Sequence, residues 1–322
     1  MNLPPPPPPP PTMPMPAAAS AASGARRLEL GLGPGPDRDT ADMTPAVMIT
    51  TSWDDGHPED LRLADLLARY EIPATFYIPR ANPLNDLPVM SESEIRGLAD
   101  RGFEVGAHTM DHVVLTDATD EVVRRELVES KAWVESVTGR PCTVFCPPKG
   151  KFAARHLDMI REAGFAGFRT TEMWSLDRPR PRHDGLLELP TTLQAQPQPV
   201  SGTVRNLAKR WAVGNAVKFL RFGRRGRWID HAEAVLDHVL SEGRGVFHLW
   251  GHSWELAEGD QWGRLERVLA RLRGTSGRAM LVSNAELCAA QGGVGVPVRA
   301  AEKIALETKT ATAADPLRPH LI

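Results

Sequence analysis

The chain has 322 residues, of which 42% are hydrophobic, and this is enough to bury the core of one large domain. Its formal net charge of −2 gives the molecule as a whole no attraction for nucleic acid, so we expect no nucleic-acid partner. Three scattered cysteines argue against a disulfide framework and against a paired-cysteine zinc site. This cysteine usage favours a reducing, cytoplasmic location.

Eight consecutive prolines, residues 4–11, begin a segment rich in Pro, Ala and Gly. Proline lacks the backbone N–H that helices and sheets need, so we expect residues 1–43 to form a polyproline or disordered tail. The absence of Lys and Arg from residues 1–22 argues against a secretion signal. We expect a second flexible tail at residues 291–322, which leaves residues 44–290 for the folded domain.

From residue 46 onwards, apolar runs typical of strands alternate with amphipathic stretches typical of helices. This alternation predicts a parallel sheet, either doubly wound or closed into a barrel. The predicted strands are Val47–Ser52, Ala74–Ile78, Phe103–Ala107, Thr143–Cys146, Phe165–Arg169, Leu186–Leu189, Val246–Trp250 and Met280–Val282. The predicted helices are Glu59–Tyr70, Ser91–Asp100, Glu121–Val137, Ala153–Ala163, His231–Ser241 and Trp262–Leu272.

The first predicted strand ends in the sequence Ser-Trp-Asp-Asp-Gly, which places Asp54 next to Asp55. Neighbouring residues of a strand face opposite sides, so one carboxylate can face a metal while the other faces a site of proton transfer. Taken alone this motif is weak evidence, because Asp-Asp-Gly is also common in surface turns.

Two histidines, His108 and His112, follow the third predicted strand. They reach a common point if the segment coils into one helical turn. With Asp55 they make a His-His-Asp set that leaves positions on a divalent metal open for water and substrate. Two ordinary surface histidines are the alternative explanation of this spacing.

A third motif, Phe-Cys-Pro-Pro-Lys-Gly at residues 145–150, also lies at the end of a predicted strand. The three motifs, in this order, resemble the Thr-Phe-Asp-Asp-Gly, His-Ser/Thr-x-x-His and Phe-Arg-Pro-Pro-Tyr-Gly motifs of the NodB-type polysaccharide deacetylases. The resemblance covers about residues 46–287. It implies an α/β fold, a distorted (β/α)7-8 barrel with its active site at the C-terminal ends of the strands, and a hydrolase that removes an N-acetyl or other N-acyl group from a sugar.

The resemblance also implies roles for individual residues. Asp54 would be the general base, and Asp55, His108 and His112 would bind the metal. Zinc is the expected ion, although the same ligands accept cobalt or nickel. A histidine at the end of the last catalytic strand would protonate the leaving amine. Both His248 and His252 are candidates, and we favour His248 because it directly follows the apolar run.

Two positions depart from the family motifs. Cys146 stands where the family has the loop arginine that pairs with the catalytic base, and Lys149 stands where it has tyrosine. Arg169, at the end of the next predicted strand, is a candidate to supply the missing guanidinium and hold Asp54 ionised. An ordinary surface arginine is an equally good interpretation of Arg169.

Several residues near strand ends are predicted to contact substrate. Flat aromatic rings suit the C–H faces of sugars, although any one of them can instead close the core. The predicted contacts are Trp53, Pro148, Lys149, Trp174, Trp250 and Trp254.

Residues 203–229 contain eight Lys and Arg residues and no Asp or Glu, interleaved with apolar residues. We expect this basic insertion, at about residues 200–230, to contact a phosphate group of a nucleotide- or lipid-linked sugar, or an anionic membrane surface. A solvated helical excursion over the barrel is the plainer alternative.

Two other functions compete with sugar deacetylation. One is an amidase that cleaves a non-sugar amide, such as an allantoin-type ureide. The other is a non-catalytic carbohydrate-binding relative. The presence of both aspartates and both histidines argues against this function, whereas the replaced loop arginine argues for it.

Overall fold

The computed structural model describes residues 47–182, 185–209, 213–223 and 226–292. Both predicted tails lie outside these residues, apart from Gln291 and Gly292. The strands, in chain order, are β1 (Val47–Asp54), β2 (Thr75–Ile78), β3 (Glu104–Ala107), β4 (Val144–Phe145), β5 (Gly167–Arg169), β6 (Arg180–Pro181), β7 (Leu187–Leu189), β8 (Leu193–Gln194), β9 (Gly245–His252) and β10 (Met280–Val282).

Helices follow most of these strands. They are α1 (Asp60–Arg69), α2 (Glu92–Asp100), α3 (Asp120–Thr138), α4 (Ala154–Glu162), α5 (Val200–Lys209), α6 (Val213–Lys218), α7 (Trp228–Glu242), α8 (Ser253–Glu258), α9 (Trp262–Arg273) and α10 (Asn284–Ala289). Short 3-10 turns cover Leu115–Asp117 and Pro148–Gly150, and a π-helical turn, Phe219–Gly223, follows α6. None of the described helices is long and apolar enough to span a bilayer.

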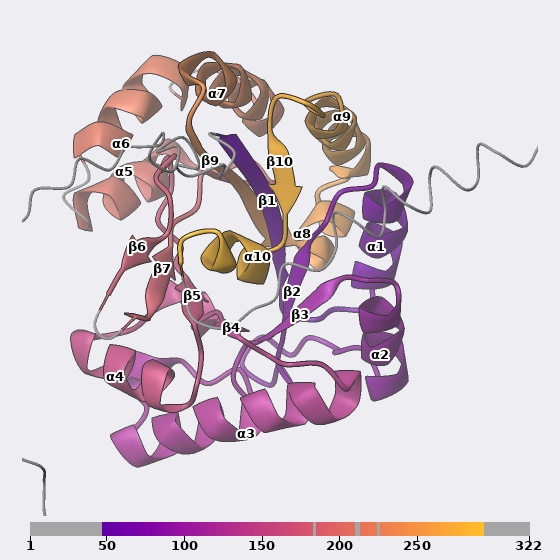
Figure 1. Cartoon of the computed structure of the whole chain (residues 1–322), viewed down its shortest axis with the longest axis vertical. Coiled ribbons are helices and arrows are strands. Elements are labelled where there is room, and N and C mark those ends of the chain that lie inside the picture. The colour runs from indigo at the N-terminus through magenta and orange to yellow at the C-terminus, as the bar shows by residue number, and fades with distance from the viewer. Residues whose placement is uncertain (1–46, 183–184, 210–212, 224–225, 293–322) are drawn as a thin grey trace, which may run out of the picture. The chain divides into compact units, whose positions relative to one another are not determined.

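The sheet curls into a barrel. Its strand order is β6-β7-β5-β4-β3-β2-β1-β9-β8, and all pairings except β6–β7 are parallel. One segment, residues 187–194, closes it, because its β7 part pairs with β5 and its β8 part pairs with β9. Figure 1 shows the helices as an outer ring around these strands. The barrel predicted by the family resemblance is therefore confirmed.

The larger of the two core clusters lies between the strands and the ring of helices. The apolar face of α1, with Leu63 and Leu67 fully buried, packs there as the leucine spacing predicts. α2 begins with a capping box, in which Ser91 and Glu94 satisfy each other's backbone N–H groups. The strand-end loops therefore rest on a rigid framework.

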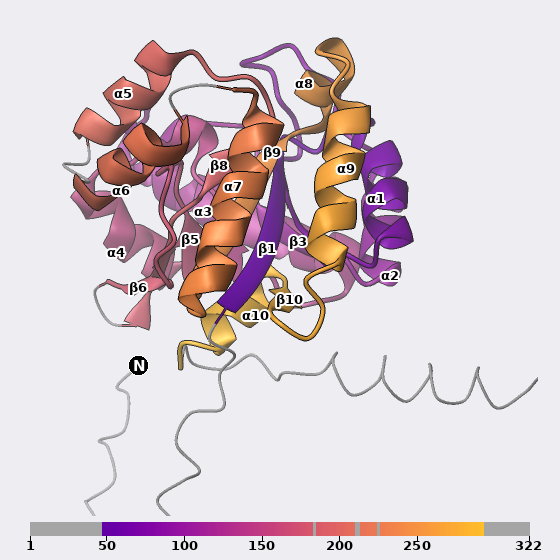
Figure 2. The ribbon, with the colours of Figure 1, turned by 90° about the horizontal axis from the view of Figure 1, so that it is seen from above.

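Opposite ends of the barrel differ in character. At the N-terminal ends of the strands, α10 closes the barrel, and Asn284 there bonds to the side chains of Thr50 and Tyr77. At the other end, loops carry the predicted site. Figure 2 shows α5 and α8 at the edge opposite α10. In a parallel barrel the edge at which the strands end is where catalytic groups gather.

Candidate active site

Strand β1 ends on two buried carboxylates. Asp54 is 4% exposed and Asp55 is 2% exposed. The backbone leaves the sheet directly after Asp54, because Asp55 has a φ of 78° and Gly56 a φ of 63°. A Cβ atom on Gly56 would lie 2.5 Å from the Ile78 side chain, so this turn requires glycine. Both carboxylates therefore lie at the C-terminal edge of the barrel.

The predicted metal ligands meet around Asp55. Its Oδ1 atom lies 3.1 Å from His112 Nε2 and 3.7 Å from His108 Nε2. His108 Nδ1 donates to the Cys146 carbonyl oxygen at 2.6 Å, which fixes the tautomer and leaves Nε2 available to an ion. Burial by itself raises the pKa of Asp55, but the two imidazoles outweigh it and hold that pKa far below its ordinary value. The carboxylate is therefore ionised.

Residues 108–112 do not coil into the helical turn that would be one way to bring the two histidines together. The segment is an irregular loop with positive φ at Thr109 (62°) and His112 (54°). Buried Glu126, on α3, holds this loop by accepting the backbone N–H of Met110 at 2.8 Å and that of Asp111 at 3.2 Å. The two histidines converge because a carboxylate from a neighbouring helix shapes the loop.

This donor set fits a divalent metal ion. One carboxylate oxygen and two imidazole nitrogens lie within 4.8 Å of one another, and this oxygen–nitrogen set suits zinc and similar ions. A second set, Asp54 with His108 and Cys146, is equally compact. It fits less well, because burial raises the pKa of the Cys146 thiol and Arg169 contacts both oxygens of Asp54. Of the two sets, Asp55, His108 and His112 therefore fit a divalent metal ion better.

Arg169 reaches Asp54 from the end of β5. Its Nη2 atom donates to both oxygens of the carboxylate, and the side chain is fully buried. The guanidinium carbon also lies 4.6 Å from the ring centroid of Trp250, so the indole ring stacks on the guanidinium and helps to hold it. Cys146 Sγ lies 3.9 Å from Asp54 Oδ2, so the small thiol lies beside the arginine. The structure thus places a guanidinium against the predicted base from a different strand than the family motif does.

The two candidate acids occupy different depths. His248 is 1% exposed, and its nitrogens bond to Ser52 Oγ at 2.8 Å and to the Pro190 carbonyl at 3.0 Å. Burial, assisted by the charge of Arg169, lowers its pKa to about 3. With both nitrogens occupied in the barrel interior, His248 does not fit the proton-donor role for which we favoured it.

His252 instead faces the carboxylates. Its Nε2 atom lies 3.9 Å from Asp54 Oδ2 and 3.9 Å from Asp55 Oδ2. Its Nδ1 atom bonds to Glu255 at 2.6 Å. Burial by itself lowers the pKa of His252, but Glu255 outweighs it and raises that pKa above its ordinary value. The ring therefore presents Nε2 to the site with its other nitrogen fixed.

Comparison with known proteins agrees with this geometry. Residues 41–168 match the family model described as polysaccharide deacetylase. The chain is 28% identical over 134 residues to a peptidoglycan-N-acetylglucosamine deacetylase of Bacillus cereus. The aligned segment covers 40% of this chain and 56% of that protein. It is also 28% identical over 116 residues to a chitooligosaccharide deacetylase of Rhizobium leguminosarum bv. trifolii. This alignment covers 36% of this chain and 50% of that protein.

Over residues 41–168 the chain is similar to the polysaccharide deacetylase family. It aligns with about half the length of these curated relatives. The family match includes the metal ligands and ends at residue 168, so Arg169, His248 and His252 lie beyond it.

Solved structures show the same fold. A probable polysaccharide deacetylase from Pseudomonas aeruginosa has a TM-score of 0.57 at 12% identity, covering 77% of this chain and 91% of the other. An allantoinase has a TM-score of 0.58 at 11% identity, covering 81% of this chain and 95% of the other. The deacetylase barrel is therefore shared with an enzyme of a different substrate class.

The predicted substrate contacts fall into two groups. Trp53 is fully buried in the core, so that prediction is wrong: it alternates with Asp54 along β1 and faces the helices. Trp250 is 6% exposed and stacks on Arg169, so it supports the guanidinium beside Asp54. Trp254 lies at the site itself, where its Nε1 atom donates to Asp55 Oδ2 at 3.0 Å.

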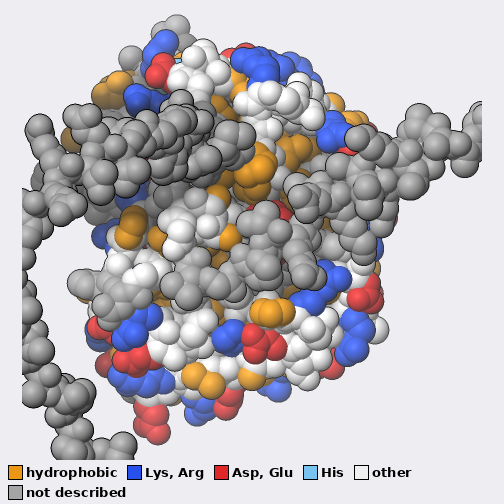
Figure 3. Space-filling model, viewed as in Figure 1, with side chains coloured by type: hydrophobic (Ala, Val, Ile, Leu, Met, Phe, Trp, Pro, Cys, Tyr) orange, Lys and Arg blue, Asp and Glu red, His pale blue; other side chains and the backbone are white. Residues whose placement is uncertain are grey.

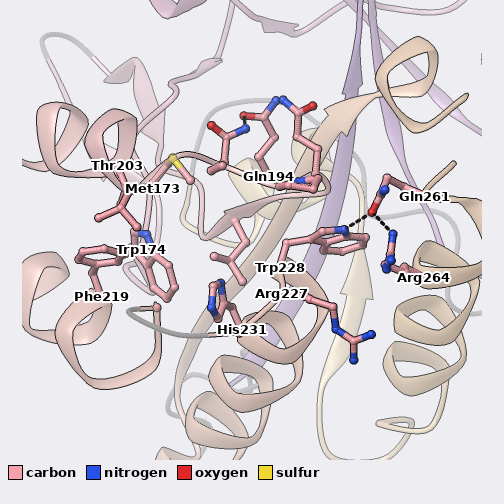
Figure 4. Close-up of a pocket in the computed structure, with 17 residues that line it drawn as sticks. Met173, Trp174, Gln194, Thr203, Phe219, Arg227, Trp228, His231, Gln261 and Arg264 are labelled. Atoms are coloured by element: carbon pink, nitrogen blue, oxygen red, sulfur yellow. Dashed lines mark hydrogen bonds between the residues drawn. The ribbon is translucent and has the colours of Figure 1, made fainter. Parts of the chain in front are cut away.

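The remaining three predicted contacts differ in exposure. Pro148 is buried, whereas Lys149 is exposed and has a φ of 57°. Trp174 is 2% exposed and packs edge-on against Phe219. It lines a cavity of about 240 Å³ beneath the insertion, across from Trp228 (Figure 4).

Three further residues surround His252 in the structure. Glu255 orients His252, and Gln194 and Gln196 in turn donate to the Glu255 carboxylate at 3.0 Å and 2.7 Å. The signal for Glu255 is its spacing of three from His252 at the start of a helix. No local pattern indicates the two glutamines, because β8 joins β9 only through the closure of the barrel.

Proposed function

We propose that the protein is a metal-dependent hydrolase that removes an N-acyl group from an N-acylated sugar. The single observation that carries this proposal is that Asp54 Oδ2 and His252 Nε2 face each other at 3.9 Å beside the Asp55–His108–His112 cluster. A base and an acid flanking a metal site suit the hydrolysis of an amide, in which water loses a proton and the leaving nitrogen gains one.

Asp55, His108 and His112 would hold the ion, and zinc is the ion that we propose. When bound, it supplies Lewis acidity that polarises the acyl carbonyl group and makes water easier to deprotonate. Trp254 and the Cys146 carbonyl orient two of the ligands through hydrogen bonds.

Asp54 is the proposed general base. The Arg169 guanidinium holds its carboxylate in place and keeps a positive charge beside it in a site from which water is largely excluded. His252 is the proposed general acid, because Glu255 favours its charged form and leaves Nε2 directed at the site. His248 then has the structural role of bonding β9 to β1 through Ser52.

The sugar substrate rests on the two relatives, which are named for acting on N-acetylglucosamine in peptidoglycan and on chitooligosaccharides. Fold alone does not separate sugars from ureides, since an allantoinase has the same barrel. We further propose that the protein acts in the cytoplasm on a precursor glycan, and that its basic insertion contacts anionic groups.

Metal content and acetate release test the proposal together. Wild type should bind close to one metal ion per chain and release acetate from N-acetylglucosamine oligosaccharides, and the His108→Ala/His112→Ala variant should do neither. His252→Asn should keep the metal but lose at least about a hundredfold in kcat. The matched control is His238→Asn, which changes a histidine on α7 that pairs with Glu242.

Each alternative gives a different result. Metal bound without acetate release, but with hydrolysis of a ureide, would replace the sugar by a non-sugar amide. Failure of wild type to bind any divalent ion would refute the hydrolase and leave a non-catalytic carbohydrate-binding protein.

A further inference from the structure

The basic insertion between β8 and α7 exposes several large apolar side chains. In the described part of the chain, seven large hydrophobic residues are exposed, and five of them lie in residues 200–220. They are Val200 (55%), Val204 (50%), Val213 (74%), Val217 (57%) and Leu220 (59%). Their spacing places two on one side of α5 and three on one side of α6 and the turn after it. We call these five residues the outer apolar face.

The inner side of the insertion contacts the barrel through Leu207 and Phe219, which are buried in the core, and through two asparagines. Asn206 donates to the Thr171 carbonyl at 2.8 Å and accepts the backbone N–H of Met173 at 3.3 Å. Asn215, which is buried, donates to Glu172 at 2.8 Å. A surface helix normally turns its apolar side to the core and its polar side to water. Here the side that faces water also carries five large apolar side chains, which points to an apolar medium or partner outside the protein.

The charge of the insertion identifies the kind of partner. No Asp or Glu occurs between Glu188 and Asp230, whereas eight Lys and Arg residues do. Arg205 and Arg221 are exposed beside the outer apolar face. None of the ion pairs seen among the described residues involves either of them or Lys218. By contrast, acidic and basic side chains intermingle on the side of the molecule formed by α3 and α4 (Figure 3).

A second copy of the chain and the chain's own ends are poorer partners. Two copies of this face would bring like charges together, which disfavours a symmetric dimer through it. Neither terminal segment complements it, because residues 1–46 contain four acidic residues against three basic ones and residues 293–322 contain three against four. An apolar stripe flanked by Lys and Arg, without acidic residues, is the pattern of a helix that lies in the interface of an anionic bilayer.

We propose that the outer apolar face docks on an anionic lipid bilayer. The valines and Leu220 enter the interface, while Arg205, Lys218 and Arg221 lie at the level of the lipid phosphates. The insertion contacts the loop that follows Arg169, and it lies at the edge of the barrel opposite α10 (Figure 2). Docking therefore brings the catalytic edge close to the membrane surface, where a membrane-associated sugar is accessible.

Flotation of the purified protein with vesicles tests this proposal independently of any enzymatic activity. Wild type should bind vesicles of phosphatidylglycerol and phosphatidylcholine but not of phosphatidylcholine alone, and molar salt should weaken the binding. Val213→Ser/Val217→Ser/Leu220→Ser should reduce the partition coefficient at least about tenfold, and so should Arg205→Glu/Arg221→Glu.

Matched controls change the same residue types elsewhere. Leu84→Ser/Val128→Ser removes the other two exposed apolar side chains, and Arg96→Glu/Arg124→Glu reverses two exposed arginines on α2 and α3. Both controls should bind like wild type. Absence of wild-type binding, or equal loss in the controls, would overturn the proposal. So would a concentration-dependent dimer that the serine variant abolishes, because the face would then contact a second copy.

All variants should keep the acetate release of wild type on a soluble oligosaccharide, because none changes a residue of the site. If wild type binds anionic vesicles but releases no acetate, the docking surface stands and only the proposed reaction fails.

Discussion

Replacing Arg169 by methionine removes a charge from the centre of the site with little change in volume. The arginine is 0% exposed and contacts both oxygens of Asp54, which is itself 4% exposed. The nearest other basic group described beside that carboxylate is His252 Nε2, at 3.9 Å. The substitution therefore leaves a buried carboxylate without its main counter-ion.

The magnitude follows from the burial of the pair. Removing one partner of a buried ion pair costs about 3–5 kcal/mol, because the desolvated charge that remains is uncompensated. A domain of this size loses roughly 2–4 °C of melting temperature per kcal/mol, so the midpoint should fall by about 6–20 °C. Asp54 would also lose its orientation, and we expect kcat/KM to fall at least about a hundredfold.

Urea unfolding at pH 7 and acetate release measure the two effects separately. Adding Cys146→Arg to Arg169→Met should recover part of both losses, because Cys146 Sγ lies 3.9 Å from Asp54 and the family motif has arginine at this position. Cys146→Arg alone should be destabilising, because two guanidinium groups would then compete for one carboxylate. A methionine variant within about 1 kcal/mol of wild type and fully active would refute the reasoning.

Two more predictions concern groups around the site and at the other end of the barrel. Trp254→Phe removes the hydrogen bond to Asp55 Oδ2, so metal affinity should fall about tenfold in a chelator competition, and unchanged affinity would exclude an orienting role. Burial raises the pKa of Glu104 from 4.5 to about 7, so the folded state holds a proton that the unfolded state has lost, and the free energy of unfolding should fall as pH rises from about 4.5 to 7. Because Glu104 is partly exposed, we expect a loss of about 2 kcal/mol rather than the full value of that shift. Glu104→Gln should flatten this pH dependence in thermal melts, and a wild-type melting temperature that is constant across the range would contradict the prediction.

Much of the fold is readable from the sequence because the signals are local. The apolar runs locate eight of the strands to within a few residues, and the leucine spacing of α1 gives its buried face. The short strands β6 and β8 and the helices α5, α6, α8 and α10 were not predicted. β8 has only two residues, and its pairing with β9 depends on where the barrel closes.

The assignment of the acid depends on where β9 ends. The predicted strand stops at Trp250, which would bring His248 close to the catalytic edge. In the structure β9 continues to His252, and the register places His252 opposite Asp54 and His248 opposite Thr50. Four residues of strand are about 13 Å, so His248 lies far below the carboxylates. An error of two residues in the predicted end of β9 is thus enough to give His248 the proposed acid role that the structure favours for His252.

Cys146 and Arg169 show that a group missing at one chain position can be supplied from another. The sequence shows that an arginine is missing from the loop after β4, and taken alone this suggests a decayed site. Parallel neighbours β4 and β5 end at the same edge, and Phe145 pairs with Phe168. Residue 169 therefore lies beside residue 146, and a guanidinium from either position reaches Asp54. The site requires a positive charge at a point in space, and two adjacent strands offer two chain positions from which to supply it.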